Sequence, residues 1–412
     1  MNKNIIVCAG WLDGNPKIGQ LFIENPRGEE IISFQFEREW LIKHSVCLDP
    51  NLSMTALRQY PPKQFMFGFL DDICPDRWGR RLIDRAIHSK GVKRTVLPSD
   101  YLLGVSDSGR VGGIRLQTED GVFLGSASLG SIPPITDLRK LEKAINVFEQ
   151  NKENVDPYLK DILAPGSSLG GARPKANVID TDGSLWIAKF PSKNDDYDVG
   201  AWEMVVHKLA KMCGISVPEA KSIKLSDRGT IFLVKRFDRS QNGLRVHYAS
   251  AMNMLGEHDN SEVRSSYLDI VSRLSEISND FASDAKQLFE RMLFNVSIGN
   301  TDDHLRNHGF LLSNDAWRLS EAFDLNPSVD KQEMSLCLDL DSNEKSIDLA
   351  LNVCEYFEYS QQEACETAKR FAKVISQNVA SLAKAQGLSN TNIDYMLPAF
   401  SESFRYGCGV GL

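Results

Sequence analysis

Asp302 and Asn307 lie five positions apart in the segment Ile298–His308, which reads Ile-Gly-Asn-Thr-Asp-Asp-His-Leu-Arg-Asn-His. This interval is typical of phosphoryl transfer to a hydroxyl, where the aspartate orients the hydroxyl and accepts its proton and the asparagine holds a metal ion. The neighbouring Asp303 lacks this spacing, because a histidine lies five positions beyond it. The segment therefore predicts Asp302 as the catalytic residue and Asn307 as a metal ligand.

Phosphoryl transfer also needs a charged metal ligand, because one neutral amide cannot help to neutralise the transferred group through the metal. Asp324 follows Asn307 at a distance typical of a strand, a turn and a second strand, and Phe323 precedes it. The pair is similar to the D-F-G element of protein kinases without its glycine. We expect Asp324 and Asn307 to hold the metal, and Phe323 and His304 to lie at the nucleotide site.

Lys189 lies in the second strand, Leu185–Phe190, of a predicted hairpin whose first strand is Lys175–Asp180. A helix that carries Glu203 follows. Protein kinases use a strand lysine against the nucleotide phosphates and pair it with a helix glutamate, and we predict these roles for Lys189 and Glu203. A solvated strand lysine is the alternative.

A loop of small residues, 165–174, precedes the hairpin and would let backbone N–H groups approach phosphates closely. It matches neither common glycine-rich nucleotide motif, so a flexible turn is the alternative. The segment Lys235–Asp238 follows the last strand of this region and would connect the two lobes of a kinase fold. Its backbone groups would be available to bind adenine. The predicted nucleotide contacts from these segments are Leu169, Gly170, Gly171, Ala172, Arg173, Lys175, Lys235 and Phe237.

Three parts of the chain must position these residues. Residues 1–125 contain short strand-like runs between turn signals, which predict a β-rich N-terminal subdomain. The pattern of residues 126–240 predicts the order strand, strand, helix, strand, strand, which is that of a kinase small lobe. Residues 241–412 have a helical period, which predicts an all-helical C-lobe interrupted by one short strand at Gly309–Leu312. The predicted fold class is thus α+β, with two lobes like those of a protein kinase.

Helix boundaries and apolar periodicity support this division. Asp76 marks a helix start and Gly214 a helix end. The helix before Gly214 has apolar residues at helical spacing, namely Trp202, Val205, Val206, Leu209 and Met212. Two further helices are predicted over Asp284–Ile298 and Gln361–Ala385.

Composition excludes several classes of function. A chain of 412 residues is too long for one ordinary core, and its formal charge of −8 disfavours a nucleic-acid footprint over the whole surface. The eight cysteines form no C-x-x-C pair, which argues for reduced thiols and against a structural zinc site, while a catalytic cysteine remains open. The chain has neither a long secretory h-region nor about 18 consecutive apolar residues, so we expect a cytoplasmic protein with no membrane partner.

Five motifs, in this order, resemble those of the HipA family of bacterial kinases, which are toxins of type II toxin–antitoxin systems. They are Ser168–Lys175, Ile187–Pro191, Val234–Arg239, Thr301–Asn307 and Phe323–Pro327. The segment Leu70–Arg80 is also similar to the additional N-terminal subdomain of the family. The resemblance covers nearly the whole chain.

The resemblance implies a serine/threonine kinase that uses ATP and Mg²⁺ to phosphorylate a cellular protein, which for the best-known members is an aminoacyl-tRNA synthetase. It also implies autophosphorylation of the phosphate-binding loop at Ser168, with Ser167 as the adjacent alternative. A phosphoserine would add nearly two negative charges where the ATP phosphates must lie.

The resemblance further implies a small helix-turn-helix antitoxin as partner, with DNA contacted mainly through it. A basic helix face in the C-lobe either touches DNA directly or is simply solvated. That face consists of Lys369, Arg370, Lys373 and Lys384.

Three other functions are considered. A kinase-fold phosphotransferase for a small molecule would share the Asp, Asn and Asp set, and a non-catalytic member would act only as a co-repressor bound to an antitoxin. A zinc hydrolase would use His304 and His308, which have the spacing of H-E-x-x-H. Leu305 occupies the glutamate position and no third ligand is evident, so His304 is expected to support the catalytic loop and His308 to be structural.

Overall fold

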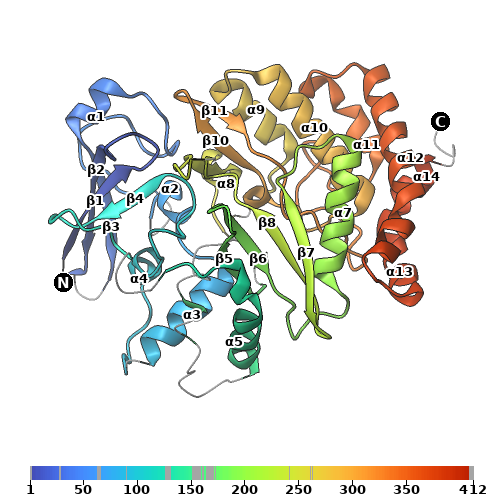
Figure 1. The fold of residues 1–412 in the computed structure, drawn as a ribbon. Helices are drawn as coiled ribbons and strands as arrows, with labels where there is room; N and C mark the ends of the chain where they lie inside the picture. Colours follow the sequence, from blue (N-terminus) through green and yellow to red (C-terminus); the bar gives the residue numbers. More distant parts are fainter. Residues whose placement is uncertain are drawn as a thin grey trace. The chain divides into compact units, whose positions relative to one another are not determined.

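The computed structural model describes the greater part of the chain (Figure 1). The described residues are 2–26, 29–62, 66–89, 91–125, 131–150, 159, 162–163, 171, 173–240, 242–259, 261 and 263–407. The chain divides into two compact units. The first unit contains Met1–Asn194, Lys235–His258 and Leu311–Asp315, and the second contains Asp195–Val234, Asp259–Phe310 and Ala316–Leu412.

An antiparallel sheet with the strand order β3-β2-β1-β4 begins the first unit (Figure 1). Its strands are β1 (Lys3–Ala9), β2 (Lys17–Glu24), β3 (Ile31–Phe36) and β4 (Ile114–Gln117). The first three follow the strand-like runs of the sequence, whereas β4 returns to pair with β1 after an intervening helical region. Apolar side chains such as Val7, Leu21 and Phe34 are buried on this sheet.

Helices follow the first three strands of the first unit. They are α1 (Arg38–Lys43), α2 (Gly68–Asp71), α3 (Arg77–His88), α4 (Pro98–Leu103), the 3-10 turn η2 (Ile135–Asp137), α5 (Leu138–Gln150) and, later in the chain, α8 (Ala251–Met254). The start of α3 is as predicted, because the Asp76 side chain accepts a hydrogen bond from the Gly79 N–H at 2.8 Å.

The predicted order strand, strand, helix, strand, strand is present. It consists of β5 (Lys175–Ile179), β6 (Leu185–Lys189), α7 (Val199–Cys213), β7 (Ala220–Ser226) and β8 (Gly229–Lys235), with β5–β6 and β7–β8 as antiparallel hairpins. Gly214 ends α7 in the left-handed conformation, with φ of 89°. The predicted apolar face is wrong at one position, because Met212 is 47% exposed while the adjacent Cys213 is buried.

The second unit is mainly helical after residue 259, as predicted. Its helices are α9 (Tyr267–Ile277), α10 (Phe281–Ile298), α11 (Ile347–Asn352), α12 (Gln361–Ala385), α13 (Asn390–Met396) and α14 (Ser401–Gly407), with 3-10 turns η3 (Leu305–Asn307), η4 (Cys354–Phe357) and η5 (Leu397–Phe400). Helix α10 lies in the core, where Phe294 meets Phe371 of α12 edge to face.

The prediction of an all-helical C-lobe with one strand needs correction. Residues 241–412 also contain β9 (Tyr248–Ser250) and β11 (Ala316–Leu319) besides β10 (Gly309–Ser313). These strands have three and four residues, which is too short for a period of two to stand out from a helical background. No helix in the described ranges is long and apolar enough to cross a membrane.

Gly299 ends α10 immediately before the segment that carries Asp302. Its φ is 66°, and a Cβ atom there would lie 2.4 Å from the Ala399 carbonyl oxygen. Gly214, the corresponding residue of α7, also has a positive φ, but nothing would lie within 4 Å of a Cβ atom. The two glycines therefore separate the cost of the left-handed conformation from the cost of close packing.

We expect Gly299→Ala to lower the free energy of unfolding by about 2–5 kcal/mol, because it adds a steric clash to the left-handed strain. Gly214→Ala, the matched control, should cost only about 1–2 kcal/mol. Urea denaturation of both variants measures the difference. An equal decrease in the free energy of unfolding for both variants would show that the main chain around Ala399 moves away from the added Cβ atom at no energetic cost.

Candidate active site

The end of α10 leads directly into the predicted catalytic segment. After Gly299 reverses the chain, the Asn300 N–H donates to the Asn295 carbonyl at 2.9 Å, and the Asn300 side-chain amide donates to Asn295 Oδ1 at 3.1 Å. Ser335 binds the Thr301 carbonyl through both its N–H and its hydroxyl. Buried hydrogen bonds therefore define where the loop leaves the helix.

Asp302 and Asp303 are adjacent in the chain but have opposite environments. Asp302 is exposed, whereas Asp303 is 2% exposed. Asp303 Oδ2 accepts a hydrogen bond from the Tyr267 hydroxyl and lies 2.9 Å from His308 Nε2. A carboxylate held in this way serves the structure, so the solvent-accessible carboxylate at this point of the loop is that of Asp302.

The partners of Asp303 form a buried polar network. Tyr267 at the start of α9 and His308 after η3 are both fully buried, and Asn295 Nδ2 donates to the Tyr267 hydroxyl at 3.2 Å. Burial alone would raise the pKa of Asp303, but the His308 ring and the two hydrogen bonds outweigh it and lower that pKa. Burial and the adjacent Asp303 raise the pKa of Tyr267 well above its ordinary value, so its hydroxyl remains a donor.

Asn307 closes the loop against Asp302. Its side-chain Nδ2 donates to the Asp302 carbonyl at 3.2 Å, and its N–H donates to the His304 carbonyl at 2.8 Å. The hydrogen bond through Nδ2 assigns the amide oxygen as the atom that a cation would take. The structure thus joins the two residues of the predicted Asp and Asn pair through the main chain of one and the side chain of the other.

Asp324 adopts a conformation that is unusual for a residue with a side chain, because its φ is 59°. Its Oδ1 accepts a hydrogen bond from Asn326 Nδ2 at 3.3 Å. Left-handed residues other than glycine cost free energy and are found disproportionately at functional sites. A carboxylate and an amide oxygen are also hard ligands of the kind that Mg²⁺ prefers, so Asp324 and Asn307 fit a magnesium ion chemically.

Four buried polar atoms of these two segments have no hydrogen-bond partner among the described residues. They are Thr301 Oγ1, His304 Nδ1, His308 Nδ1 and Asn326 Oδ1. Buried polar atoms are seldom left unpaired in folded proteins, and each exception calls for a partner. Three of these atoms, on Thr301, His304 and Asn326, belong to residues within two positions of Asp302 or Asp324, which suits a polar ligand.

Lys175, a predicted phosphate ligand, has a partner inside the first unit. Its Nζ lies 3.2 Å from Asp76 Oδ2, and both side chains are less than one-tenth exposed. Asp76 also begins α3, and the Trp78 indole N–H donates to the Lys175 carbonyl at 3.1 Å. Burial raises the pKa of Asp76 although Lys175 opposes the shift. Lys175 therefore ties β5 to the start of α3, and a role at phosphates would compete with this ion pair.

The predicted phosphate-binding loop is described only in part. Gly171 has φ of 97°, and Arg173 donates from Nη2 to the Phe190 carbonyl at 3.2 Å. The other predicted residues of the loop lie outside the described residues. They are Ser167, Ser168, Leu169, Gly170 and Ala172.

The remaining predicted residues lie in both units. Lys189 ends β6 and Lys235 ends β8, both in the first unit, where the Phe237 ring packs 6.1 Å from the Tyr248 ring. Glu203 is buried on α7 of the second unit. His304 and Phe323, which are half-buried, belong to the second unit as well.

Sequence reasoning missed the residues that support the site. Asp303 lacks the catalytic spacing, and Tyr267 belongs to no motif and lies more than 30 positions from the catalytic segment. Asp76 was interpreted only as a helix cap. The two adjacent aspartates in Thr301–His304 could have indicated that one of them has a structural role, because two neighbouring carboxylates cannot both face one reactive group without repulsion.

We expect Asp303→Asn to lower the free energy of unfolding by about 1–3 kcal/mol at neutral pH, because Tyr267 and His308 lose a charged acceptor. The folded-state pKa of Asp303 is lowered, so its contribution is present above the unfolded value of about 4 and is lost as pH falls through the folded value. Chemical denaturation as a function of pH should show the wild-type advantage shrinking in acid. An unchanged free energy at neutral pH would contradict the assigned network.

We expect a double-mutant cycle on Lys175→Met and Asp76→Asn to give a coupling free energy of about 1–3 kcal/mol, because each single change leaves a buried group without its partner. Thermal or chemical unfolding of the four proteins measures it. The exposed pair of Lys43 and Glu39 on α1 of the same unit is a suitable control and should couple by less than about 1 kcal/mol. Additive effects at Lys175 and Asp76 would show that the ion pair does not stabilise the fold.

Comparison with known proteins identifies the family of this chain. The model of the family described as HipA-like C-terminal domain matches residues 167–386, which is more than half of the chain. Two relatives from Sinorhizobium fredii, named Putative kinase Y4dM and Putative kinase Y4mE, are 28% identical over 155 residues and 24% identical over 191 residues. These matches cover 35% and 41% of this chain, and the chain spans only 37% and 44% of the lengths of the two relatives.

A similar fold occurs in the structure of the Shewanella oneidensis MR-1 toxin antitoxin system HipA, HipB and its operator DNA complex. One chain of that structure aligns with a TM-score of 0.70 over 98% of this chain and 96% of its own length, at 17% identity. The α+β, two-lobed kinase-like fold class predicted from the sequence is thereby confirmed. Together with the match to the family model, this shows that the chain belongs to the HipA-like C-terminal domain family.

Proposed function

We propose that this protein is an ATP- and Mg²⁺-dependent serine/threonine protein kinase of the HipA type. The observation that carries the proposal is the contrast between two adjacent acids, since Asp303 is buried and bonded while Asp302 is exposed. A general base must reach the proton that it accepts, and of these two residues only Asp302 can do so. Membership of a family whose relatives are named as kinases supports the same reaction class.

In the proposed reaction, Asp302 orients a serine hydroxyl and accepts its proton as the hydroxyl oxygen attacks the γ-phosphorus of ATP. The new bond joins the serine oxygen to phosphorus, and the bond from phosphorus to the ADP oxygen breaks. Asn307 and Asp324 would hold Mg²⁺, which when bound neutralises charge on the transferred group. The hydrogen bond from Asn307 to the Asp302 carbonyl would hold the base and this ligand together in one loop.

The nucleotide contacts are proposed from the residue types and from their order along the sequence. Lys189 would contact the phosphates, Glu203 would orient that lysine, and the main chain around Lys235 and Phe237 would meet adenine. Phe323 and His304 would complete the nucleotide site.

Substrate, regulation and partner are also proposals. We propose a serine of a cellular protein as acceptor, with Ser168 as a self-phosphorylation site that silences the enzyme by placing charge in the phosphate site. The similar fold in a structure that contains HipB and operator DNA supports a HipB-like antitoxin as partner, with DNA contacted mainly through it. The cytoplasmic location and the domain boundaries at residues 125 and 240 remain predictions.

We expect purified protein to incorporate phosphate from labelled MgATP, and Asp302→Asn to reduce the rate at least about 100-fold, because a positioned base contributes that much. Asp324→Asn should reduce it comparably, since asparagine tolerates the left-handed conformation but lacks the charge that a cation requires. Incorporation of radiolabel measures the rate, and mass spectrometry locates the phosphate, which we expect on Ser168 or Ser167.

Asp394→Asn is the matched control, because Asp394 is an exposed aspartate of the same unit on α13. It should leave the rate unchanged. Phosphate incorporation that persists in Asp302→Asn would refute the assignment of the base. Nucleotide binding without any incorporation would favour a small-molecule phosphotransferase or a co-repressor instead.

A further inference from the structure

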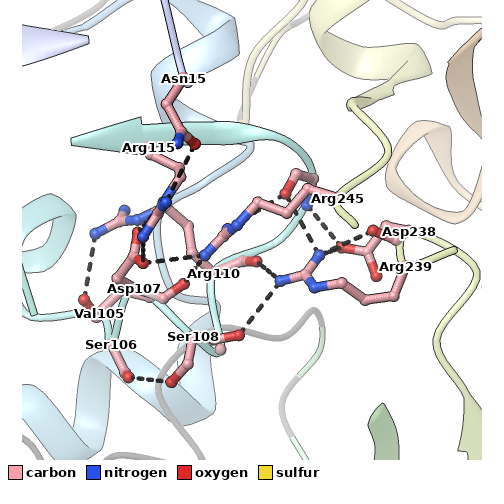
Figure 2. A network of polar contacts seen from close by, with 12 residues as sticks. Asn15, Val105, Ser106, Asp107, Ser108, Arg110, Arg115, Asp238, Arg239 and Arg245 are labelled. Carbon is pink, nitrogen blue, oxygen red and sulfur yellow. Dashed lines mark hydrogen bonds and ion pairs between the residues drawn. The ribbon is translucent and has the colours of Figure 1, made fainter. Parts of the chain in front are cut away.

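Asp238, in the segment that follows β8, belongs to a buried network of the first unit that joins this segment to a loop of the N-terminal subdomain (Figure 2). Its Oδ2 accepts hydrogen bonds from the Gly112 N–H at 2.7 Å, from Arg236 Nη2 at 2.5 Å and from Arg239 Nη1 at 2.9 Å. Burial alone would raise the pKa of Asp238, but the two guanidinium groups hold it far below its ordinary range. The carboxylate is therefore charged at neutral pH.

The same arginines bind the main chain of the loop 105–112. Arg236 donates from Nη1 to the Gly109 carbonyl at 2.7 Å and from Nη2 to the Arg110 carbonyl at 3.1 Å. Arg239 donates from Nη2 to the carbonyls of Arg110 at 2.9 Å and Ser108 at 3.3 Å. A planar guanidinium group fixes the direction of each donor, so these bonds set the position of one segment against the other.

Arg245 and Asp107 extend the network (Figure 2). Arg245 Nη2 donates to the Asp107 carbonyl at 2.5 Å and lies 3.2 Å from its carboxylate, which Arg115 of β4 also binds at 2.6 Å. Burial lowers the pKa of Arg245 to about 9 and that of Arg239 to about 10, although the nearby carboxylates oppose the shift. Both arginines remain charged at neutral pH.

Phe237 lies between the two anchored residues Arg236 and Asp238. Arg236 also binds Asn177 Oδ1 of β5 at 2.8 Å, and its N–H donates to the Leu185 carbonyl of β6 at 2.9 Å. The main chain at Phe237 is thus held on both sides.

The loop also reaches the residue that packs on Phe237. Gly112 has φ of 68°, and a Cβ atom there would lie 3.0 Å from the Tyr248 N atom. Tyr248 is the residue whose ring packs against Phe237. The loop therefore limits the position of Phe237 through its neighbour as well as through the arginines.

We infer that the loop 105–112 of the N-terminal subdomain positions the segment 235–239 and thereby determines how well the enzyme discriminates between nucleotide bases. The inference rests on the proposed function, in which the main chain of this segment meets adenine. Discrimination between bases depends on hydrogen-bonding groups held in fixed positions. If the segment 235–239 were released from the loop, this discrimination would be lost. Asp238, Arg236, Arg239 and Arg245 are positioning residues in this scheme and touch no substrate.

The test compares the dissociation constants of MgATP and MgGTP for the unmodified protein, Asp238→Asn and Arg245→Gln by calorimetry. We expect the preference for MgATP to fall about tenfold in Asp238→Asn, which weakens the acceptor shared by Gly112 and two arginines, and about threefold in Arg245→Gln at the edge of the network. Because a ratio does not depend on the fraction of folded protein, a general loss of stability leaves it unchanged.

Arg58→Gln is the matched control, since Arg58 binds Glu24 and Ser33 in the same unit but contacts neither the loop nor the segment. Its ratio should equal that of the unmodified protein. If Asp238→Asn does not fold, Arg245→Gln alone decides. An unchanged ratio in the folded variants, or an equal change in Arg58→Gln, would overturn this inference and leave the kinase intact. Failure of the unmodified protein to bind either nucleotide would overturn the proposed function, and the inference with it.

Discussion

A carboxylate can be buried only if donors replace the water that it loses, and this constraint shapes the candidate active site. Asp303 meets it with the Tyr267 hydroxyl and the His308 ring, which come from a different helix and from the far end of the same loop. Once these bonds form, the loop after α10 has little freedom. The exposure of Asp302 and the closure by Asn307 then follow from the anchor rather than from any property of Asp302 itself.

The same constraint acts in the first unit, where the carboxylate of Asp238 is surrounded by arginines. There the guanidinium groups carry more donors than one carboxylate can accept, and the surplus binds backbone carbonyls of the loop 105–112. The Asp238 contact with Gly112 spans 126 positions of sequence, so it joins segments that no local preference could align. Lys175 and Asp76 likewise form a buried ion pair that joins two segments distant in sequence, here β5 and the start of α3.

Local patterns were sufficient for most elements of the fold. Helix α12 begins and ends at the predicted residues, and the hairpin of β5 and β6 and the stop of α7 at Gly214 also match, because periodicity and a left-handed glycine are properties of neighbouring residues. Strands β4 and β9 were missed because they are short and pair with strands distant in sequence, whereas β11 pairs with the adjacent β10 and is the second strand expected between Asn307 and Asp324. Met212 was misplaced because the last turn of a helix can leave an apolar residue in solvent.

The sequence by itself determined the family and the chemistry that we propose, since the interval between Asp302 and Asn307 and the order of the five motifs are visible without coordinates. It also determined which of two adjacent acids has the catalytic spacing. Only the tertiary structure decided what the other residues do, namely that Asp303 anchors the loop and that Lys175 has a buried partner. The physical reason is that a side chain acquires its role from its burial and its donors, and both are set by parts of the chain that meet only on folding.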